Sequence, residues 1–426
     1  MAKDKIINVI DLGSSKIACC AVSVKEDSIP SVIGVASFPS KGFKRGQIVD
    51  IESVISSLTQ CVEAAERMAG INIGSAYVSV GSVNLNSRNS RGVVAVSDPN
   101  SEITKDDIER VIDAARAVTL PPSYEVIHVI PRDFIVDGQS GIRDPKGMMG
   151  IRLEVDTHIV IESLPNIRNI LKAMKELGIE VEKFVFCGLA SSLAVLSDTE
   201  KDLGVILLDI GSGKTDMAVW IDGSLTYSAV LPVAGLHVTK DIALGLRVSL
   251  ESAEKIKLFL TDKYAVIDDE TKKKEAYKDE IDIRELNLPE NITKVSKKTL
   301  IDGIIKPRLT EIFGLAAAEL EKQNLLNTTP AGIVLTGGGA LTHGIVDVAR
   351  NKMALPVRIG VPYPMSGLTD EIQNPPYATS AGLINFAISE EKIGKKHGKS
   401  SLEMIRHVPA GNIIRNIGKF FKNFLP

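Results

Sequence analysis

The sequence is poor in aromatic residues, in cysteine and in long apolar runs. Aromatic side chains make up 4% of its 426 residues, and there is one tryptophan. None of the four cysteines, at positions 19, 20, 61 and 187, belongs to a Cys-x-x-Cys pair, which argues against zinc. We expect these thiols to be buried and reduced, as in a cytosolic protein. The N-terminal apolar run is too short for a signal peptide, and no run approaches the roughly 18 apolar residues that a membrane span needs.

The chain nevertheless has enough apolar residues for a large core. They make up 44% of the sequence, which is typical of globular proteins. Its length predicts roughly two to four domains. The net charge of −3 gives no reason to expect nucleic acid as a partner.

The stretch DIGSGKTD, Asp209 to Asp216, looks at first like a phosphate-binding loop. It lacks the first glycine of a Walker A loop, because position 208 is Leu208, and Asp216 stands where a dinucleotide-binding fingerprint has its third glycine. The strand-like MAVW and the Asp222-Gly223 turn that follow predict a hairpin. The stretch is therefore either a strand-turn-strand phosphate clamp or an ordinary polar hairpin.

A repeat within the sequence favours the phosphate clamp. Residues 5–81 predict three short strands, a helix with apolar positions from Ile51 to Met68, and a fourth strand. A similar order starts again at position 203, and the turns DLGSSK (11–16) and DIGSGK (209–214) share one pattern, 198 residues apart (209 minus 11). Such a distance suggests duplicated domains, which would bring both turns to one cleft if they face each other.

The paired turns predict a site for phosphate and a divalent cation. Asp11 and Asp209 are expected to hold a hydrated Mg²⁺, which proteins usually bind through one or two carboxylates plus waters and phosphates. Backbone N–H groups of the turns can reach phosphate oxygens, and their lysines add positive charge. The residues assigned to the phosphates are Gly13, Ser14, Ser15, Lys16, Gly211, Ser212, Gly213, Lys214 and Thr215.

A third glycine cluster is expected to bind the nucleoside. Gly337, Gly338, Gly339 and Ala340 follow a predicted strand and precede a helix expected from about Leu341. Three successive glycines let a flat group approach the backbone closely, although such a run alone is usually only a tight turn. As the third element after two Asp-Gly turns, it is assigned to the nucleoside.

Together these elements resemble the two phosphate motifs and the adenosine motif of the superfamily that contains actin, sugar kinases and the heat-shock ATPases. The resemblance is closer to FtsA, a family of bacterial cell-division proteins, and extends over nearly the whole chain. It rests on the stretches PSKGFKRGQIVDIESV (39–54), GLASSLAVL (188–196), VLPVAGLHVTKDIALGL (230–246) and PVRIGVPYPMSGLTD (356–370).

The resemblance implies an α/β, actin-like fold: duplicated βββαβαβα domains of the ribonuclease-H type around a nucleotide cleft, with an inserted α+β subdomain in the first half. The implied parts are a first actin-like subdomain (1–83, 163–200 and 379–391), the insert (84–162), a second actin-like subdomain (201–240 and 308–378), its small subdomain (241–307), a flexible basic linker (392–408) and an amphipathic helix (409–426).

The insert is expected to combine one helix with long strands. Thr104 is a predicted N-cap with Asp107 three residues later, and two strand-like segments, 124–138 and 150–162, follow. In the family this subdomain contacts other division proteins and neighbouring subunits. From the residues alone, it is a peripheral domain with no visible function.

The resemblance also extends the nucleotide site and bears on hydrolysis. It implies that Gly235 lies in the site and that Glu254 and Lys257 of SAEKIK reach the ribose or base. The alternative is an i,i+3 ion pair on a solvated helix. The Gln or Glu that orients the attacking water in active actin-like relatives corresponds here to Cys187, and a thiol is a poor general base there. We therefore expect ATP and Mg²⁺ to bind with slow or undetectable hydrolysis, and we assign no catalytic residue.

The C-terminal GNIIRNIGKFFKNFLP predicts an amphipathic helix. Its apolar face comprises Ile413, Ile414, Ile417, Phe420, Phe421, Phe424 and Leu425. The opposite face carries Arg415, Lys419 and Lys422 and no acid. From position 392 onward, eight Lys and Arg and one acid give +7, which leaves −10 for the remaining chain. The helix either docks on its own domain or lies in an anionic bilayer surface, and the second agrees with the family, whose members attach to the inner membrane this way.

The resemblance further implies protein partners. In the family the small subdomain binds the C-terminal peptide of the tubulin-like FtsZ. The cations around the apolar strip of KVSKKTLIDGIIKPR could hold such an acidic, partly apolar peptide, or could form a solvated charged face: Lys294, Lys297, Lys298, Lys306 and Arg308. The implied function is a protein that polymerises on the cytoplasmic side of the inner membrane at the septum, anchors the FtsZ ring and recruits other division proteins.

Three other functions within the superfamily fit less well. A sugar or acetate kinase would need a catalytic Asp facing a substrate pocket, and no candidate is evident. A heat-shock-type chaperone would need a sizeable C-terminal peptide-binding domain. A pilus-assembly or shape-determining homologue would share the nucleotide motifs but not the GLASSLAVL and SGLTD stretches.

Overall fold

The computed structural model describes residues 5–24, 30–98, 102–117, 120–266, 279–369 and 371–396. The chain divides into two compact units, Met1–Asn385 and Phe386–Pro426. The features below belong to the first unit, apart from the end of the last helix, which extends to Lys396. The predicted amphipathic helix, 409–426, lies outside the described residues. Among the helices of the described residues, none combines the length and hydropathy that crossing a bilayer requires.

The first half is built on a six-stranded sheet in the order β11-β6-β1-β2-β3-β19. Its strands are β1 (Lys5–Leu12), β2 (Lys16–Val24), β3 (Ser31–Pro39), β6 (Ser75–Val80), β11 (Glu180–Phe186) and β19 (Ser366–Gly367). Strands β1 to β3 form an antiparallel meander, whereas β6 and β11 continue the sheet parallel to β1. A two-residue hairpin of β4 (Phe43–Lys44) and β5 (Gln47–Ile48) follows the meander.

Two helices, α1 (Ile51–Ala69) and α3 (Leu164–Glu176), bury apolar faces in the core of this half. In α1, the carboxylate of Asp50 caps the helix by accepting from the backbone N–H of Ser53, and Gly70 ends it in the left-handed region. The buried positions of α1 recur at helical spacing, as predicted, which fixes the face that packs on the sheet.

The second half repeats this arrangement. Its sheet has the order β14-β13-β12-β17-β18, which corresponds to β3-β2-β1-β6-β11 of the first half. Its strands are β12 (Val205–Ile210), β13 (Thr215–Ile221), β14 (Ser224–Leu231), β17 (Ile333–Thr336) and β18 (Val357–Ile359). Its helices are α6 (Gly235–Leu246), α7 (Leu250–Val266), α9 (Lys306–Lys322) and α10 (Ile345–Met353).

The two halves also agree in strand register. Asp11 lies opposite Ala18 across the β1–β2 hairpin, and Asp209 lies opposite Asp216 across the β12–β13 hairpin. A shift of 198 residues therefore superimposes the pairing of one hairpin on the other. The predicted duplication is confirmed.

Between α7 and α9 the chain forms a small, partly irregular region. It contains β15 (Glu280–Asp282), the 3₁₀ turn η1 (Arg284–Leu286), β16 (Lys294–Ser296) and the π-helical η2 (Lys298–Ile305). Apolar side chains from these elements, including Ile281, Val295 and Leu300, join the hydrophobic core of the second half.

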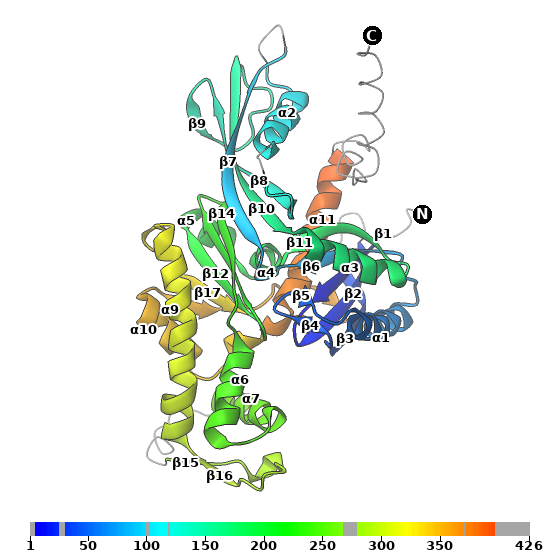
Figure 1. Ribbon diagram of the computed structural model, residues 1–426. Helices are drawn as coiled ribbons and strands as arrows, with labels where there is room; N and C mark the ends of the chain where they lie inside the picture. Colours follow the sequence, from blue (N-terminus) through cyan, green and yellow to red (C-terminus); the bar gives the residue numbers. More distant parts are fainter. Residues whose placement is uncertain are drawn as a thin grey trace, which may run out of the picture. The chain divides into compact units, whose positions relative to one another are not determined.

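The segment predicted as an insert forms a sheet of its own, in the order β7-β10-β8-β9, with the helix α2 packed on it (Figure 1). The elements are β7 (Asn86–Ala95), α2 (Lys105–Arg116), β8 (Tyr124–Val136), β9 (Gln139–Ile142) and β10 (Arg152–Ser163). Thr104 and Asp107 form the predicted capping box at the start of α2. A separate apolar core, which includes Val111 and Leu153, stabilises this subdomain.

The insert touches the second half through neutral polar groups. The Nε2 of His158, on β10, lies 3.0 Å from Ser228 Oγ of β14. Its Nδ1 lies 2.8 Å from Asn89 Oδ1 within the insert. The hydroxyl of Ser87 donates to the carbonyl of Ser228 at 2.7 Å. Burial lowers the pKa of His158 to about 3, so its ring is neutral near pH 7.

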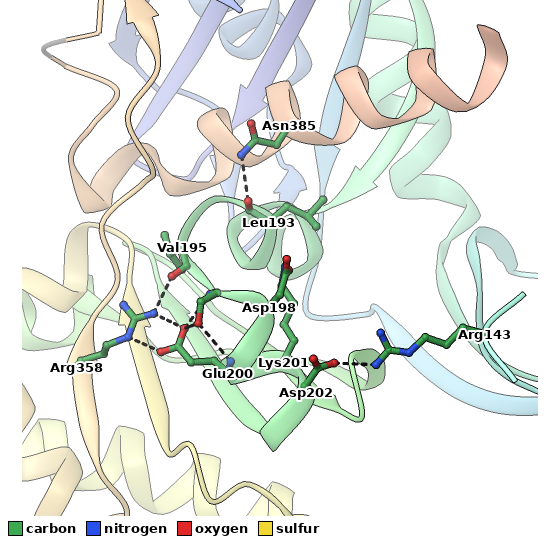
Figure 2. Close-up of polar contacts among 10 residues, drawn as sticks. Arg143, Leu193, Val195, Asp198, Glu200, Lys201, Asp202, Arg358 and Asn385 are labelled. Atoms are coloured by element: carbon green, nitrogen blue, oxygen red, sulfur yellow. Dashed lines mark hydrogen bonds and ion pairs between the residues drawn. The ribbon is translucent and has the colours of Figure 1, made fainter. Parts of the chain in front are cut away.

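Two helices connect the halves. One is α4 (Cys187–Val195), which leaves β11 of the first sheet, and the other is α11 (Ala378–Lys396), which follows the 3₁₀ turn η5 (Pro375–Tyr377). They cross so closely that a Cβ on Gly382 would overlap the carbonyl oxygen of Ala190. The amide of Asn385 donates to the carbonyl of Leu193 at 3.1 Å, farther along the same contact (Figure 2).

The short helix α5 (Asp198–Leu203) follows α4 and is held from two sides by arginines (Figure 2). Arg358 of β18 binds both carboxylate oxygens of Glu200, at 2.6 and 2.7 Å, and donates to the carbonyl of Val195 at 2.8 Å. Arg143, which follows β9 of the insert, pairs with Asp202 at 2.9 Å. Burial alone would raise the pKa of Glu200, but hydrogen bonds from Arg358 and Ser197 lower it to about 2.

Three predicted boundaries differ from the structure. Instead of a helix from Leu341, a 3₁₀ turn η4 (Gly338–Leu341) precedes α10, because Gly344 adopts the left-handed region and interrupts the helix. Helix α6 begins at Gly235, whereas the sequence pattern predicts a helix from about Val238. Helix α11 continues to Lys396, into the segment expected to be a flexible linker from 392, since lysine is a good helix former.

Candidate functional site

A cavity of about 540 Å³ is lined by residues of both halves. The volume falls within the range of roughly 300–1,000 Å³ typical of small-molecule sites. Its walls include sixteen of the eighteen residues predicted to bind a nucleotide: Asp11, Gly13, Ser14, Ser15, Lys16, Asp209, Gly211, Ser212, Gly213, Lys214, Gly235, Glu254, Lys257, Gly337, Gly338 and Gly339. Three segments that are far apart in the sequence therefore meet at one site.

The two Asp-Gly turns have the same geometry. The N–H of Gly13 donates to the carbonyl of Lys16 at 3.0 Å, and the N–H of Gly211 donates to the carbonyl of Lys214 at 3.0 Å. The turns also approach each other, because a Cβ on Gly213 would lie 3.0 Å from the hydroxyl of Ser14. Glycine at position 213 therefore lets the two turns approach without crowding Ser14.

Each of the paired aspartates is held by two hydroxyl groups. Asp11 accepts hydrogen bonds from Ser79 at 2.9 Å and from Ser380 at 3.0 Å. Asp209 accepts from Thr379 at 2.9 Å and from Ser191. Adjacent residues at the start of α11, Thr379 and Ser380, therefore orient one aspartate of each half.

The aspartates provide the chemistry that a hard cation requires. Burial raises the pKa of Asp11, hydroxyl donors and Lys16 lower it, and the negative charge of Asp209 raises it again. Two carboxylates that repel each other at the wall of a cavity form a site where a divalent cation relieves the repulsion. Asp11 and Asp209 thus fit a Mg²⁺, and water and phosphate oxygens would supply its remaining ligands.

The two lysines of the turns have different partners. The ammonium of Lys16 lies 2.8 Å from the ring centroid of Tyr377, and burial lowers the pKa of Lys16 to about 8 although Asp11 opposes this shift. Lys214 forms a buried ion pair with Asp216. Burial alone would lower the pKa of Lys214, but attraction to Asp216 raises it above its ordinary value.

Glycines and leucines form the side of the cavity predicted for the nucleoside. Gly235 donates its N–H to the carbonyl of Gly211 at 3.1 Å, and a Cβ on Gly235 would lie 3.6 Å from the Cα of Gly339. Three leucines that line the cavity are exposed to solvent: Leu250, Leu258 and Leu341. Exposed apolar side chains beside a glycine-rich backbone suit a flat, partly apolar group.

Glu254 and Lys257 form the ion pair that was the alternative to a role in binding. Their charged atoms are 2.8 Å apart, and both bond to the hydroxyl of Thr239, at 2.5 and 2.9 Å. Both side chains nevertheless line the cavity, so the pair and a ligand contact are compatible.

Two predicted residues lie outside the cavity wall. The hydroxyl of Thr215 donates to the carbonyl of Val233 at 2.7 Å, away from the cavity, and Ala340 is buried behind the glycines. Cys187 does line the cavity, and burial raises the pKa of its thiol.

The sequence reasoning did not identify several residues of the site. The hydroxyls of Ser191, Thr379 and Ser380 bond to the two aspartates, and Asp216 pairs with Lys214 in the cavity wall. Ser191 lies in the GLASSLAVL stretch and Asp216 ends DIGSGKTD, so both belong to motifs that the sequence analysis quoted but did not assign to the site. No local pattern around Thr379 and Ser380 signals their role, because it arises only from the crossing of α11 over α4.

Two buried polar atoms of the site lack a hydrogen-bond partner in the described structure, Ser14 Oγ and Asp216 Oδ1. One belongs to each half, and both residues line the cavity. Because buried polar atoms are rarely left unpaired in native proteins, both atoms indicate that the cavity receives a polar ligand or water.

The cations predicted to hold a peptide are largely paired within the chain. Lys294 bonds to Glu280 and Lys306 to Asp302, each at 2.6 Å, and Arg308 binds Asp241 at 2.5 and 3.0 Å. Lys297 and Lys298 lie at the start of η2. A hollow of about 330 Å³ beside Arg308 is lined in part by Leu244, Ile304 and Pro307. The predicted membrane-binding residues, 413–425, lie outside the described part of the chain.

The duplicated sheets and the cavity between them place the protein in the actin-like fold class. It is similar to the solved structures entitled "PilM-PilN type IV pilus biogenesis complex" (TM-score 0.61, 16% identity, covering 88% of this chain and 97% of that one) and "Crystal structure of MreB5 of Spiroplasma citri bound to ADP" (TM-score 0.52, 16% identity, covering 92% and 99%). At this identity the similarity establishes the fold alone, and the predicted fold class is confirmed.

Sequence comparison identifies the family. Residues 83–161 match the family model "SHS2 domain inserted in FTSA", and residues 206–382 match "Cell division protein FtsA". Relatives with that second name include those of Pseudomonas aeruginosa (37% identity, covering 98% of this chain and 97% of the relative), Bacillus subtilis (36%, 93% and 87%) and Escherichia coli K12 (32%, 98% and 98%). The chain belongs to the FtsA family of cell-division proteins, as the resemblance indicated.

The glycine cluster provides a matched pair of substitutions. Gly337 has φ 82° and ψ 168°, a backbone region open almost only to glycine, and a Cβ there would overlap the carboxylate of Asp209. We expect Gly337→Ala to destabilise the protein by about 1–3 kcal/mol or more. Gly338→Ala is the control, because the nearest heavy atoms to its Cβ would be 4.0 Å away. Thermal unfolding of both variants measures the difference, and equal melting temperatures would contradict the geometry.

Proposed function

We propose that this protein binds Mg-ATP between its two halves and uses the bound nucleotide to order a cell-division scaffold at the membrane. The observation that carries the proposal is the convergence of Asp11 and Asp209, each oriented by two hydroxyl groups, on one cavity between duplicated halves. The fold supports it, because a structure of the same fold class, MreB5 of Spiroplasma citri, was solved with ADP.

The residues present suit each part of the nucleotide. Asp11 and Asp209 would hold Mg²⁺, which neutralises phosphate charge when bound. The two turns and their lysines would hold the phosphates, with the unpaired hydroxyl of Ser14 as a further donor. The backbone of Gly337 to Gly339 and the exposed leucines would accept the adenosine, with Glu254 and Lys257 beside the ribose.

The proposal includes slow hydrolysis. Cys187 occupies the position at which active relatives are expected to carry a water-orienting Gln or Glu, and its buried thiol with a raised pKa stays protonated near pH 7. With no strong base at that position, ATP serves mainly as a ligand that holds the two halves together, so its binding energy is available to favour one arrangement of the protein.

We predict a turnover number well below the roughly 1–10³ s⁻¹ of typical enzymes. Phosphate release from saturating Mg-ATP, measured with the full chain, checks this expectation. Asp209→Ala is the control for activity that belongs to the site. Robust turnover that Asp209→Ala abolishes would refute the assignment of Cys187 to the water-orienting position.

The proposed scaffold reaches the membrane through its C-terminal segment. The seven apolar residues of the predicted helix from Ile413 to Leu425 share one face, and the opposite face is cationic. This distribution suits insertion into the headgroup region of an anionic bilayer. The segregation of +7 at the C-terminal end from −10 elsewhere also favours this end of the chain as the part nearest an anionic surface.

We predict that deletion of 409–426 abolishes co-sedimentation with anionic vesicles. Each basic residue near the surface contributes about 1 kcal/mol, so the double change Lys419→Gln and Lys422→Gln should weaken binding by about 30-fold. Vesicles of neutral lipid are the control for the electrostatic part. Undiminished binding of the deletion variant would exclude the helix as the anchor.

The remaining partners follow from the family and belong to the same proposal. A polymer of this chain on the cytoplasmic side of the inner membrane at the septum would anchor the FtsZ ring and recruit other division proteins through the insert. The hollow beside Arg308 and its basic surroundings would accept the FtsZ C-terminal peptide, which would have to compete with Asp241 for Arg308.

A further inference from the structure

The cavity wall contains a buried ion pair that has no counterpart in the first half. Lys214 and Asp216 project from β13 and its preceding turn, and both are less than one-tenth exposed. In the first half, the register places Lys16 at the position of Lys214 but Ala18 at the position of Asp216. Since the first hairpin forms without a carboxylate at this position, pairing of the two strands does not require Asp216.

The pair lies beside Cys187 in the cavity wall. A Cβ on Gly81 would lie 2.9 Å from Asp216 Oδ1, 3.1 Å from Lys214 Nζ and 3.4 Å from the sulfur of Cys187. Among the residues assigned to the nucleoside, a Cβ on Gly235 would lie 3.6 Å from the Cα of Gly339 and 3.9 Å from Lys257 Nζ. The family resemblance assigns Cys187 to the position that orients the attacking water, next to the terminal phosphate. A bound ATP would therefore place its last phosphate near Lys214.

The hydrogen bonds of the pair would allow a phosphate to replace Asp216 as the partner of Lys214. Lys214 Nζ bonds to Asp216 Oδ2, whereas Asp216 Oδ1 is buried and has no partner in the described structure. A carboxylate with one satisfied and one unsatisfied oxygen is a weaker partner for a buried ammonium than a phosphate, which carries more negative charge and more acceptor atoms.

We propose that Lys214 is the residue by which the site distinguishes ATP from ADP: Asp216 holds its ammonium until the terminal phosphate of ATP takes Asp216's place. This inference rests on the proposed function and deepens it. Mg-ADP lacks the phosphate that reaches Lys214, so the ion pair stays closed when ADP is bound. The exchange gives the protein a response to nucleotide state that does not depend on hydrolysis.

The test compares equilibrium affinities of the full chain for Mg-ADP and for a Mg-bound, non-hydrolysable ATP analogue by calorimetry. The wild type should prefer the analogue. Lys214→Met should lower affinity for the analogue about tenfold or more, because a charge-assisted hydrogen bond is lost, and leave ADP affinity within about twofold. Asp216→Asn should retain the preference or increase it, because the lysine is no longer held by a charge.

Two further variants keep the result interpretable. Lys214→Met leaves a buried carboxylate unpaired, which can destabilise the fold, so the double variant Lys214→Met/Asp216→Asn removes both charges and should also lose the preference. Lys257→Met, at the nucleoside side, should weaken both ligands equally. Equal losses for both ligands with Lys214→Met, or a preference that survives in the double variant, would overturn the inference. A wild type that binds neither ligand would overturn the proposed function and the inference with it.

Discussion

The close crossing of α4 and α11 at Ala190 and Gly382 is the contact on which the rest of the site depends. Each helix begins at the edge of one half and places hydroxyl groups on the aspartates: Ser191 of α4 bonds to Asp209, and Thr379 and Ser380 of α11 bond to Asp209 and Asp11. Any side chain larger than hydrogen at position 382 would push the helices apart and move these hydroxyls. Backbone packing at one point therefore determines whether two carboxylates, 198 residues apart in sequence, can share one cation.

The same region connects the site to the outer parts of the molecule. Helix α5 continues from α4 and is paired through Glu200 to the second sheet and through Asp202 to the insert. A change in the angle between the two halves would displace α4 and α5. It would therefore strain the contacts of Arg358 with Glu200 and of Arg143 with Asp202. Packed elements with discrete alternatives are a known means of converting a small change at a ligand site into a larger rearrangement. The proposed binding of a nucleotide between the halves would act on this connection without hydrolysis.

The sequence predicted the duplicated architecture well because the evidence was local and repeated. The two turns carry the same Asp, Gly, Ser and Lys, and their agreement indicated two copies before any pairing was known. The capping box at Thr104 and the apolar stripe of α1 are likewise set by neighbouring residues. Thirteen of the sixteen predicted nucleotide residues that line the cavity were found for the same reason, since they lie in or beside glycine-rich turns at strand ends. The other three, Gly235, Glu254 and Lys257, belong to α6 and α7 and came from the family resemblance.

What the sequence did not predict depends on contacts between distant segments. Thr215 was grouped with its turn, but alternation along β13 directs its hydroxyl to Val233 instead. The roles of Thr379 and Ser380 exist only because α11 crosses α4, and the pairing of Arg308 with Asp241 only because α9 packs beside α6. The start of α10 was misjudged because the left-handed backbone of Gly344 is not evident from the run of glycines before it.

The central claim is that Asp11 and Asp209 hold one cation together. Affinity for ATP measured with Mg²⁺ and with a chelator, in Asp11→Asn, Asp209→Asn and the double variant, tests it most directly. The account predicts that either single change removes most of the Mg²⁺-dependent gain in affinity and that the double variant loses little more, because both side chains serve the same ion. Additive losses, or a loss confined to one of the two variants, would contradict it.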